Sequence, residues 1–208
     1  MKLSAYVIAT DKGFAPNPFG RQCTLACCKP QIRRNAEVDD IVMATAGHDF
    51  ERAGSLVYAM KISEVLTFNE YWKDSRFASR KPSNTTAISR CGDNIWHHEG
   101  GRWLLAPHAQ HERNEEHYDT SGENVLIATE FFYFGREAVE LPKEFAVLRC
   151  NGRGHTNEDD EKLVQRFWKW LNDTYPRGRI GDPTEFGARV RCHRARRLLA
   201  LRLLYEEL

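Results

Sequence analysis

The chain has 208 residues, of which 41% are hydrophobic and 28% charged, and its formal net charge is +1. This length suits one domain with a single core, and the ordinary composition excludes a disordered or fibrous protein. No segment approaches the roughly 20 apolar residues of a membrane span, and Asp11 and Lys12 end the first apolar segment too early for a signal peptide.

The cysteines and arginines refine these expectations. The six cysteines have no framework spacing, so we expect reduced thiols in a cytoplasmic protein. Arginines crowd the last part of the chain, whereas acidic residues dominate residues 112–130. The basic end is either a phosphate-binding surface or a solvated helix face.

The first third of the chain predicts strands separated by a proline-rich loop. Residues 3–10 are typical of a strand, and residues 13–20, with two prolines and two aromatics, of an exposed loop. Residues 23–28 form a buried strand or a short helix. Residues 38–46 and 55–65 alternate and are β-branched, which predicts two neighbouring antiparallel strands.

The middle of the chain is polar and less regular. Thr67 and Glu70 have the spacing of a capping box, which predicts the start of a short helix. Residues 74–122 predict long loops with short strands near 95–96 and 102–105. Loops of this length are often functional.

The last third predicts the core strand and two helices. Residues 124–135 are the most hydrophobic segment and predict a central strand that turns at Phe131. Residues 159–171 place apolar side chains on one helical face. We expect one domain over residues 1–175 and an Arg-rich helical extension over residues 176–208, whose second half alternates arginine with leucine as an amphipathic helix does.

Residues 152–157 combine two glycines with polar side chains just before the predicted helix. Backbone amides there could cradle a phosphate, but the acidic first turn of the helix repels an anion. Arg153 and His155 are therefore better suited as donors to a neutral base. The alternative is a tight turn in which Thr156 or Asn157 caps the helix.

Histidines and cysteines supply the remaining reactive groups. Five histidines cluster without any zinc-motif spacing, and they are His97, His98, His108, His111 and His117. We therefore expect loop histidines, with no metal and no cofactor. The alternative is a metal site, since imidazole is a common metal ligand. Positive charge at Lys29, Arg33 and Arg34 favours the nucleophilic thiolate at nearby cysteines. The nearby cysteines are Cys23, Cys27 and Cys28. The alternative is that all three are small core residues.

An ordered set of segments covers most of residues 1–175: 13–19 (GFAPNPF), 23–26 (CTLA), 28–30 (CKP), 32–34 (IRR), 56–60 (LVYAM), 66–72 (LTFNEYW), 92–96 (GDNIW), 131–135 (FFYFG) and 152–155 (GRGH). The set resembles the nucleotide-modification-associated domain 2 family of bacteria and phages, which gene neighbourhood links to DNA base modification. Asp39-Asp40 stands where the family would have Gly-Asp. More faintly, the chain is similar to the PUA-like barrels that include the EVE, ASCH and YTH modules.

The resemblance implies an α+β fold, a small mixed or antiparallel PUA-like β-barrel with flanking helices. The Arg-rich C-terminal amphipathic helix, after Arg177, lies outside the resemblance. The resemblance also implies a domain that binds a nucleic-acid or nucleotide base in the context of DNA base modification. Expected partners are nucleic acid or a nucleotide and DNA-modification enzymes, with no membrane. Fold analogy alone does not establish function.

Two hypotheses assign residues to this function. In the first, a base is held by Phe14, Asn17, Phe19, Asn94 and Trp96, with Trp72 and Trp103 as further candidates for stacking. Phosphate is bound by Arg33, Arg34 and Arg153. In the second, the chain is an enzyme that modifies a nucleotide or DNA base through acid-base chemistry of His155 and Asp93 or a Cys28 nucleophile. The first predicts that loop 14–19, the Asp93-Asn94 turn and the Arg153–His155 turn converge.

Overall fold

The largest element of the fold is a six-stranded sheet. The computed structural model describes residues 1–152 and 154–186. The strand order is β10-β1-β3-β4-β9-β11, with β1 parallel to β3, β9 parallel to β11, and the other neighbours antiparallel. The strands are β1 (Leu3–Ile8), β3 (Ile41–Ala46), β4 (Leu56–Lys61), β9 (Glu130–Tyr133), β10 (His155–Glu158) and β11 (Gly178–Arg179). The antiparallel pairing of β3 with β4 confirms the prediction for these two segments.

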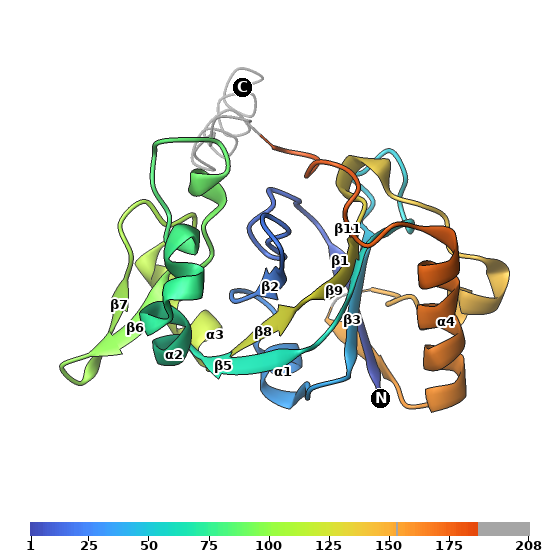
Figure 1. Cartoon of the computed structure of the whole chain (residues 1–208), viewed down its shortest axis with the longest axis horizontal. Coiled ribbons are helices and arrows are strands. Elements are labelled where there is room, and N and C mark those ends of the chain that lie inside the picture. Colours follow the sequence, from blue (N-terminus) through green and yellow to red (C-terminus); the bar gives the residue numbers. More distant parts are fainter. Residues whose placement is uncertain (153, 187–208) are drawn as a thin grey trace, which may run out of the picture.

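One face of this sheet packs against α4 (Glu161–Thr174), which lies along the outer side of the sheet in Figure 1. Asp160 caps the helix, since its side chain accepts hydrogen bonds from the amides of Lys162 and Leu163. The predicted caps Thr156 and Asn157 are instead part of β10. The apolar face of α4 packs against Phe132 of β9, so this face of the helix is buried, as its periodicity predicted.

The other face packs against a three-stranded sheet in the order β2-β8-β5. Its strands are β2 (Cys23–Leu25), β5 (Glu64–Thr67) and β8 (Asn124–Ala128), and α1 (Pro30–Asn35) follows β2. Side chains of β1, β3 and β4 share one hydrophobic cluster with side chains of β2 and β8. Because both faces of the central strands are covered, β3 is buried along its whole length.

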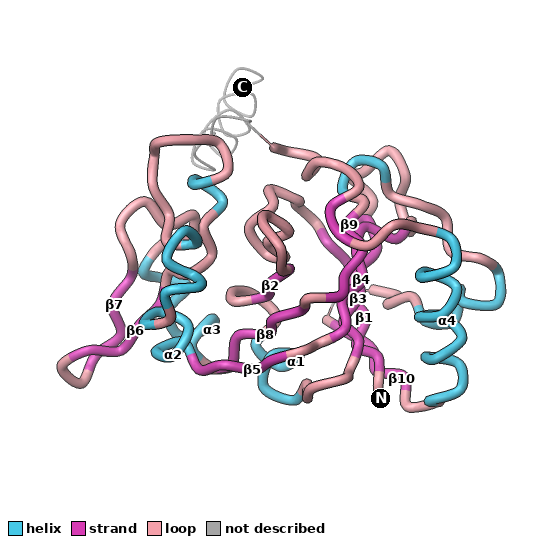
Figure 2. The backbone as a smooth tube through the Cα atoms, viewed as in Figure 1, coloured by secondary structure: helices cyan, strands magenta, loops and turns pink. Residues whose placement is uncertain are grey.

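A third layer lies on the far side of the small sheet (Figures 1 and 2). It contains α2 (Phe68–Lys73), the hairpin of β6 (Trp96–Glu99) and β7 (Arg102–Leu105), and α3 (Glu116–Thr120). Thr67 and Glu70 form the predicted capping box at the start of α2. Short 3-10 helices complete the described chain: η1 (Ser75–Arg80), η2 (Ser89–Cys91), η3 (Arg113–Glu115), η4 (Gly135–Glu137) and η5 (Lys143–Leu148).

The α+β class is confirmed, but the predicted PUA-like barrel is not, because no sheet closes on itself within residues 1–152 and 154–186. The hydrophobic segment 124–135 breaks at Thr129 and not at Phe131, so β8 joins the small sheet and β9 the large one. β4 and β5 divide in the same way. The chain therefore bends from one sheet into another instead of curling one sheet into a barrel.

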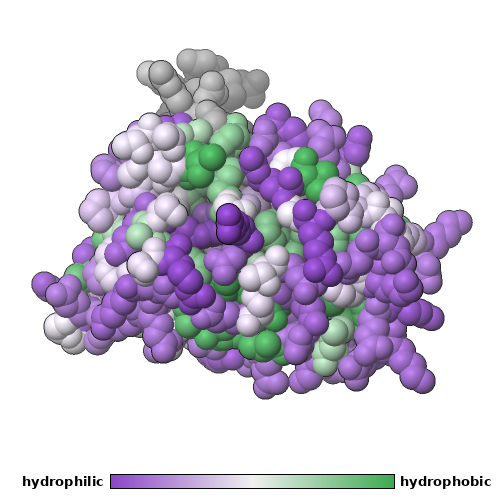
Figure 3. All heavy atoms as spheres, in the orientation of Figure 1, coloured by the Kyte–Doolittle hydropathy of each residue, from purple (hydrophilic) through white to green (hydrophobic). Residues whose placement is uncertain are grey.

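Hydrophilic residues cover most of the face drawn in Figure 3, with hydrophobic areas between them. No helix in the described chain is long and apolar enough to cross a membrane. The amphipathic helix predicted at the C-terminus lies outside the described residues, as does Arg153.

A fully buried arginine joins three segments of this fold. The Arg33 guanidinium donates to the carbonyls of Cys28 at 2.7 Å, Asn124 at 2.7 Å and Asp119 at 2.6 Å, and also to that of Gly122. These carbonyls belong to the loop after β2, the start of β8 and the end of α3. A lysine has one point of donation and could not serve all of them.

We therefore expect Arg33→Lys to lower the free energy of unfolding by about 3 kcal/mol, because it leaves buried carbonyls without donors. The neighbouring Arg34 is exposed and donates only to the Ser121 carbonyl, so Arg34→Lys should stay within about 0.5 kcal/mol of wild type. Urea unfolding followed by circular dichroism measures both values. Equal losses in the two variants would contradict the interpretation.

Candidate active site

The side chains predicted to hold a base lie in the interior. Their exposed fractions are 5% for Phe14, 2% for Asn17, 8% for Phe19, 1% for Asn94 and 0% for Trp96. The loop 13–20, predicted to be exposed, is in fact largely buried. Aromatic faces that are covered by protein offer no surface on which a base can stack.

Asp93 is also fully buried and organises the loop around it. Its carboxylate accepts hydrogen bonds from Tyr71 at 2.8 Å and from Thr24, and Arg80 donates to the same Thr24 hydroxyl at 2.8 Å. Burial raises the pKa of Asp93. The Asn17 amide donates to the Cys91 carbonyl at 2.8 Å. Loop 14–19 and the Asp93-Asn94 turn therefore do lie together, but as part of the core.

His155 lies elsewhere. It is on β10, opposite Tyr6 on β1, at the edge of the large sheet. Figures 1 and 2 show β10 and the segment 89–94 on opposite sides of the molecule. The structure thus brings two of the three predicted turns together and separates His155 from Asp93. Arg33 is buried among carbonyls, whereas Arg34 is exposed.

Cys28 meets a histidine and an aspartate that the sequence did not connect with it. The Cys28 thiol lies 3.7 Å from Nε2 of His111, and Nδ1 of His111 donates to the Asp119 carboxylate at 2.5 Å. Cys28 is half-buried, the His111 side chain is 14% exposed, and that of Asp119 is fully buried. A thiol, an imidazole and a carboxylate in this order are the parts of a nucleophilic catalytic triad.

The loop after β2 presents Cys28 in a constrained backbone. Cys28 and Lys29 both have left-handed conformations, with φ of 60° and 43°. Each such residue costs about 1 kcal/mol or more, and strain of this kind concentrates at functional sites. The Cys28 amide donates to Asp119 Oδ1 at 2.8 Å, and its carbonyl accepts from Arg33 at 2.7 Å. Both ends of the strained residue are therefore held.

Asp119 is itself fixed from the hairpin. The Trp96 indole nitrogen donates to Asp119 Oδ2 at 3.0 Å from the start of β6. The Phe14 ring lies edge-on to His111, with the centroids 4.9 Å apart. Two residues predicted to contact a base thus contact the acid and the imidazole of the triad.

The charges of the triad support one another. Burial lowers the pKa of His111, but hydrogen bonds to Asp119 and Cys28 outweigh burial and raise the value to about 10. Burial raises the pKa of Asp119, but the hydrogen bond and charge of His111 bring it below its ordinary value. These shifts favour an imidazolium at His111 that is paired with an ionised Asp119 carboxylate.

The same region contains three groups that could bind a metal ion. Donor atoms of Cys27, His111 and Asp119 lie within 4.8 Å of one another. However, His111 and Asp119 bond each other directly at 2.5 Å, and the buried Cys27 thiol donates to the Asp93 carbonyl at 3.6 Å. Burial also raises the pKa of Cys27 well above its ordinary value, which disfavours the thiolate that a metal requires. The arrangement fits an acid-base triad better than a metal ion.

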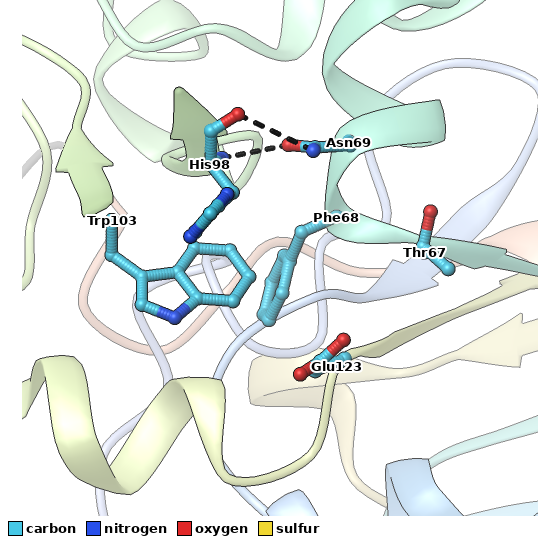
Figure 4. A pocket seen from close by; sticks show the side chains of 6 residues that line it. All are labelled: Thr67, Phe68, Asn69, His98, Trp103 and Glu123. Atoms are coloured by element: carbon cyan, nitrogen blue, oxygen red, sulfur yellow. Dashed lines mark hydrogen bonds between the residues drawn. The ribbon is translucent and has the colours of Figure 1, made fainter. Parts of the chain in front are cut away.

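A separate surface hollow of about 330 Å³ lies where α2 begins beside the hairpin. Its lining residues are Thr67, Phe68, Asn69, His98, Trp103 and Glu123. Figure 4 shows Trp103, His98 and Phe68 grouped together, with Glu123 across from them. The Asn69 amide donates to and accepts from the backbone of His98, which ties α2 to β6.

The pKa shifts predict how stability depends on pH. A folded pKa raised from 6.5 to about 10 makes the His111 contribution complete below pH 6.5 and removes it as pH rises toward 10. The lowered pKa of Asp119 makes its contribution present above its ordinary 3.8 and removes it as pH falls. Wild type should therefore exceed the neutral variant His111→Gln/Asp119→Asn in unfolding free energy most strongly between about pH 4 and 6.5.

Chemical unfolding across pH measures that difference. Cys28 and Glu115, whose carboxylate lies 3.8 Å from His111, are present in both proteins. His98→Gln provides the control for replacing a histidine, since the exposed His98 hydrogen-bonds to Asn69 through its backbone. If the difference in unfolding free energy between wild type and the double variant stayed constant from pH 6.5 to 10, the imidazolium assignment would be contradicted.

Comparisons with known proteins place the chain in a family. The family model described as Nucleotide modification associated domain 2 matches residues 1–190, a range that holds all three triad residues and continues past the predicted boundary at residue 175. Neither the search of curated proteins nor that of solved structures found a match. Because the match spans most of the 208 residues, the chain belongs to the nucleotide modification associated domain 2 family.

Proposed function

We propose that the protein is a thiol-dependent enzyme of nucleotide modification, with Cys28 as nucleophile, His111 as proton carrier and Asp119 as the residue that orients His111. The observation that carries the proposal is the alignment of these groups, with 3.7 Å from thiol to imidazole and 2.5 Å from imidazole to carboxylate. The family's association with nucleotide modification supplies the substrate class, a nucleotide or a group attached to its base.

The chemistry follows from the positions of the protons. The Cys28 thiolate attacks an electrophilic carbon of the substrate and forms a carbon–sulfur bond, while the His111 imidazolium gives its Nε2 proton to the departing amine or alcohol. The neutral imidazole then takes a proton from water or an acceptor nucleophile, which displaces Cys28. Asp119 keeps Nδ1 protonated throughout and so directs Nε2 toward the sulfur.

The acid-base pair of His155 and Asp93 has less support. The two residues lie in different parts of the fold, and the Asp93 carboxylate is fully buried and engaged by Tyr71 and Thr24. General acid-base catalysis requires both groups within reach of one substrate. Cys28, half-buried and beside His111, is the predicted reactive residue that meets this requirement.

Cys28→Ala should abolish turnover, because the carbon–sulfur bond can no longer form. The assay incubates the protein with nucleotides and DNA oligonucleotides and detects mass changes in both substrate and protein. Cys91→Ala is the matched control, since this buried thiol contacts only backbone carbonyls and burial raises its pKa to about 11. Turnover that persists in Cys28→Ala would refute the proposal.

A second candidate function, base binding without chemistry, is favoured by the hollow beside α2. Trp103 lies 5.6 Å from Phe68 and 5.3 Å from His98 between ring centroids, and Glu123 could accept hydrogen bonds from a base edge. An aromatic-lined hollow with one polar group fits a planar ligand. This location replaces the buried residues that the sequence indicated.

If the hollow binds a base, Trp103→Ala should weaken the affinity for single-stranded oligonucleotides about tenfold, the effect of losing one stacking partner. Fluorescence anisotropy at fixed salt measures it. Trp72→Ala is the control, because Trp72 stacks on His97 at 3.9 Å and does not line the hollow. Equal affinities for all three proteins would leave the hollow without this role.

A further inference from the structure

Lys29 is the positive charge that directly follows the proposed nucleophile. Its ammonium lies 4.6 Å from the centroid of the Tyr6 ring, on β1 of the large sheet. The side chain is half-buried, and burial lowers its pKa. Lys29 follows Cys28 directly in the chain and places its ammonium over the ring of Tyr6.

No carboxylate of the described residues lies within ion-pair distance of the Lys29 ammonium. Among residues 1–152 and 154–186, the lysines that form ion pairs are Lys61, with Asp39, and Lys169, with Asp173. The other ion pairs there are formed by arginine or histidine, so none includes Lys29. The buried arginines Arg33 and Arg80 are engaged by carbonyls. A partly desolvated ammonium without a carboxylate at ion-pair distance is costly, and a bound anion would relieve that cost.

The backbone also fixes where Lys29 begins. Lys29 lies between Cys28 and Pro30, the first residue of α1, and has a left-handed backbone with φ of 43°. Its carbonyl accepts a hydrogen bond from the Arg33 amide at 3.1 Å. The side chain thus leaves the main chain from a constrained point next to the thiol. A positioned cation beside a nucleophile can both attract and orient a charged substrate.

We propose that Lys29 is an anion-binding residue of the Cys28 site, and that it selects substrates carrying a phosphate close to the carbon that Cys28 attacks. This inference rests on the proposed function for the role of Cys28. Phosphate is the anion that a nucleotide substrate carries, and lysine binds it as a compact point charge. The phosphate belongs either to a free nucleotide or to a nucleic-acid backbone.

Alkylation of Cys28 tests the charge without any turnover. Iodoacetate is anionic and iodoacetamide is neutral, but both react with the same thiolate. A change in the thiolate fraction therefore alters both rates equally and leaves their ratio unchanged. Peptide mass spectrometry gives the rate at Cys28 for each reagent in the full-length chain.

Lys29→Gln should lower the iodoacetate-to-iodoacetamide ratio at Cys28 about three- to tenfold, the effect of removing one nearby charge near a protein surface. Lys29→Arg should retain the ratio, since it keeps the charge. Lys81→Gln is the matched control, because Lys81 also lies over an aromatic ring, that of Trp72 at 3.8 Å, but is not next to the thiol. An unchanged ratio in Lys29→Gln would overturn the proposal.

Protection identifies the source of the phosphate. A nucleoside monophosphate or a single-stranded oligonucleotide should slow iodoacetate labelling of wild type and have less effect on Lys29→Gln. Protection by the monophosphate alone supports a nucleotide substrate, and protection by the oligonucleotide alone supports a nucleic-acid strand. Failure of both to protect would overturn the phosphate assignment. If Cys28→Ala retains turnover while Lys29→Gln still lowers the iodoacetate-to-iodoacetamide ratio, only the proposed reaction is refuted.

Discussion

The site depends on one buried carboxylate. Asp119 accepts hydrogen bonds from the Cys28 amide, the Trp96 indole and the His111 imidazole, while its own carbonyl accepts from Arg33. An ionised carboxylate in the interior is strongly destabilising unless it is paired and hydrogen-bonded. Because its donors come from the loop after β2, the hairpin and the segment before α3, satisfying Asp119 requires that these segments lie together.

The same contacts link stability to the proposed chemistry. Arg33 holds the Cys28 carbonyl and Asp119 holds the Cys28 amide, so the left-handed backbone that presents the thiol is fixed on both sides. Only the outer members of the set, Cys28 and His111, reach the surface. Asp119 is thus fully buried while Cys28 and His111 are partly exposed, which fits the proposed roles of an orienting acid and of two reacting groups.

Local patterns in the sequence predicted the elements better than their assembly. Alternation predicted β3 and β4 as an antiparallel pair, the Thr67 and Glu70 spacing predicted the capping box of α2, and helical periodicity predicted α4. The PUA-like barrel is not confirmed in the described residues, because a break at Thr129 that a continuous hydrophobic run does not reveal divides β8 and β9 between two sheets. Glycine, proline and aromatic residues in 13–20 indicated an exposed loop, yet Asn17 and Arg80 satisfy its polar groups internally and bury it.

The sequence by itself determined the family, the α+β class and Cys28 as a reactive candidate, because each rests on local order or on neighbouring residues. Tertiary structure alone decided the partners of Cys28. His111 and Asp119 lie far along the chain in a segment without periodicity, where imidazoles and carboxylates are ordinary loop residues. A hydrogen bond depends on distance in space, and the packing of α1, α3 and the hairpin around Asp119 is what brings thiol, imidazole and carboxylate within reach of one another.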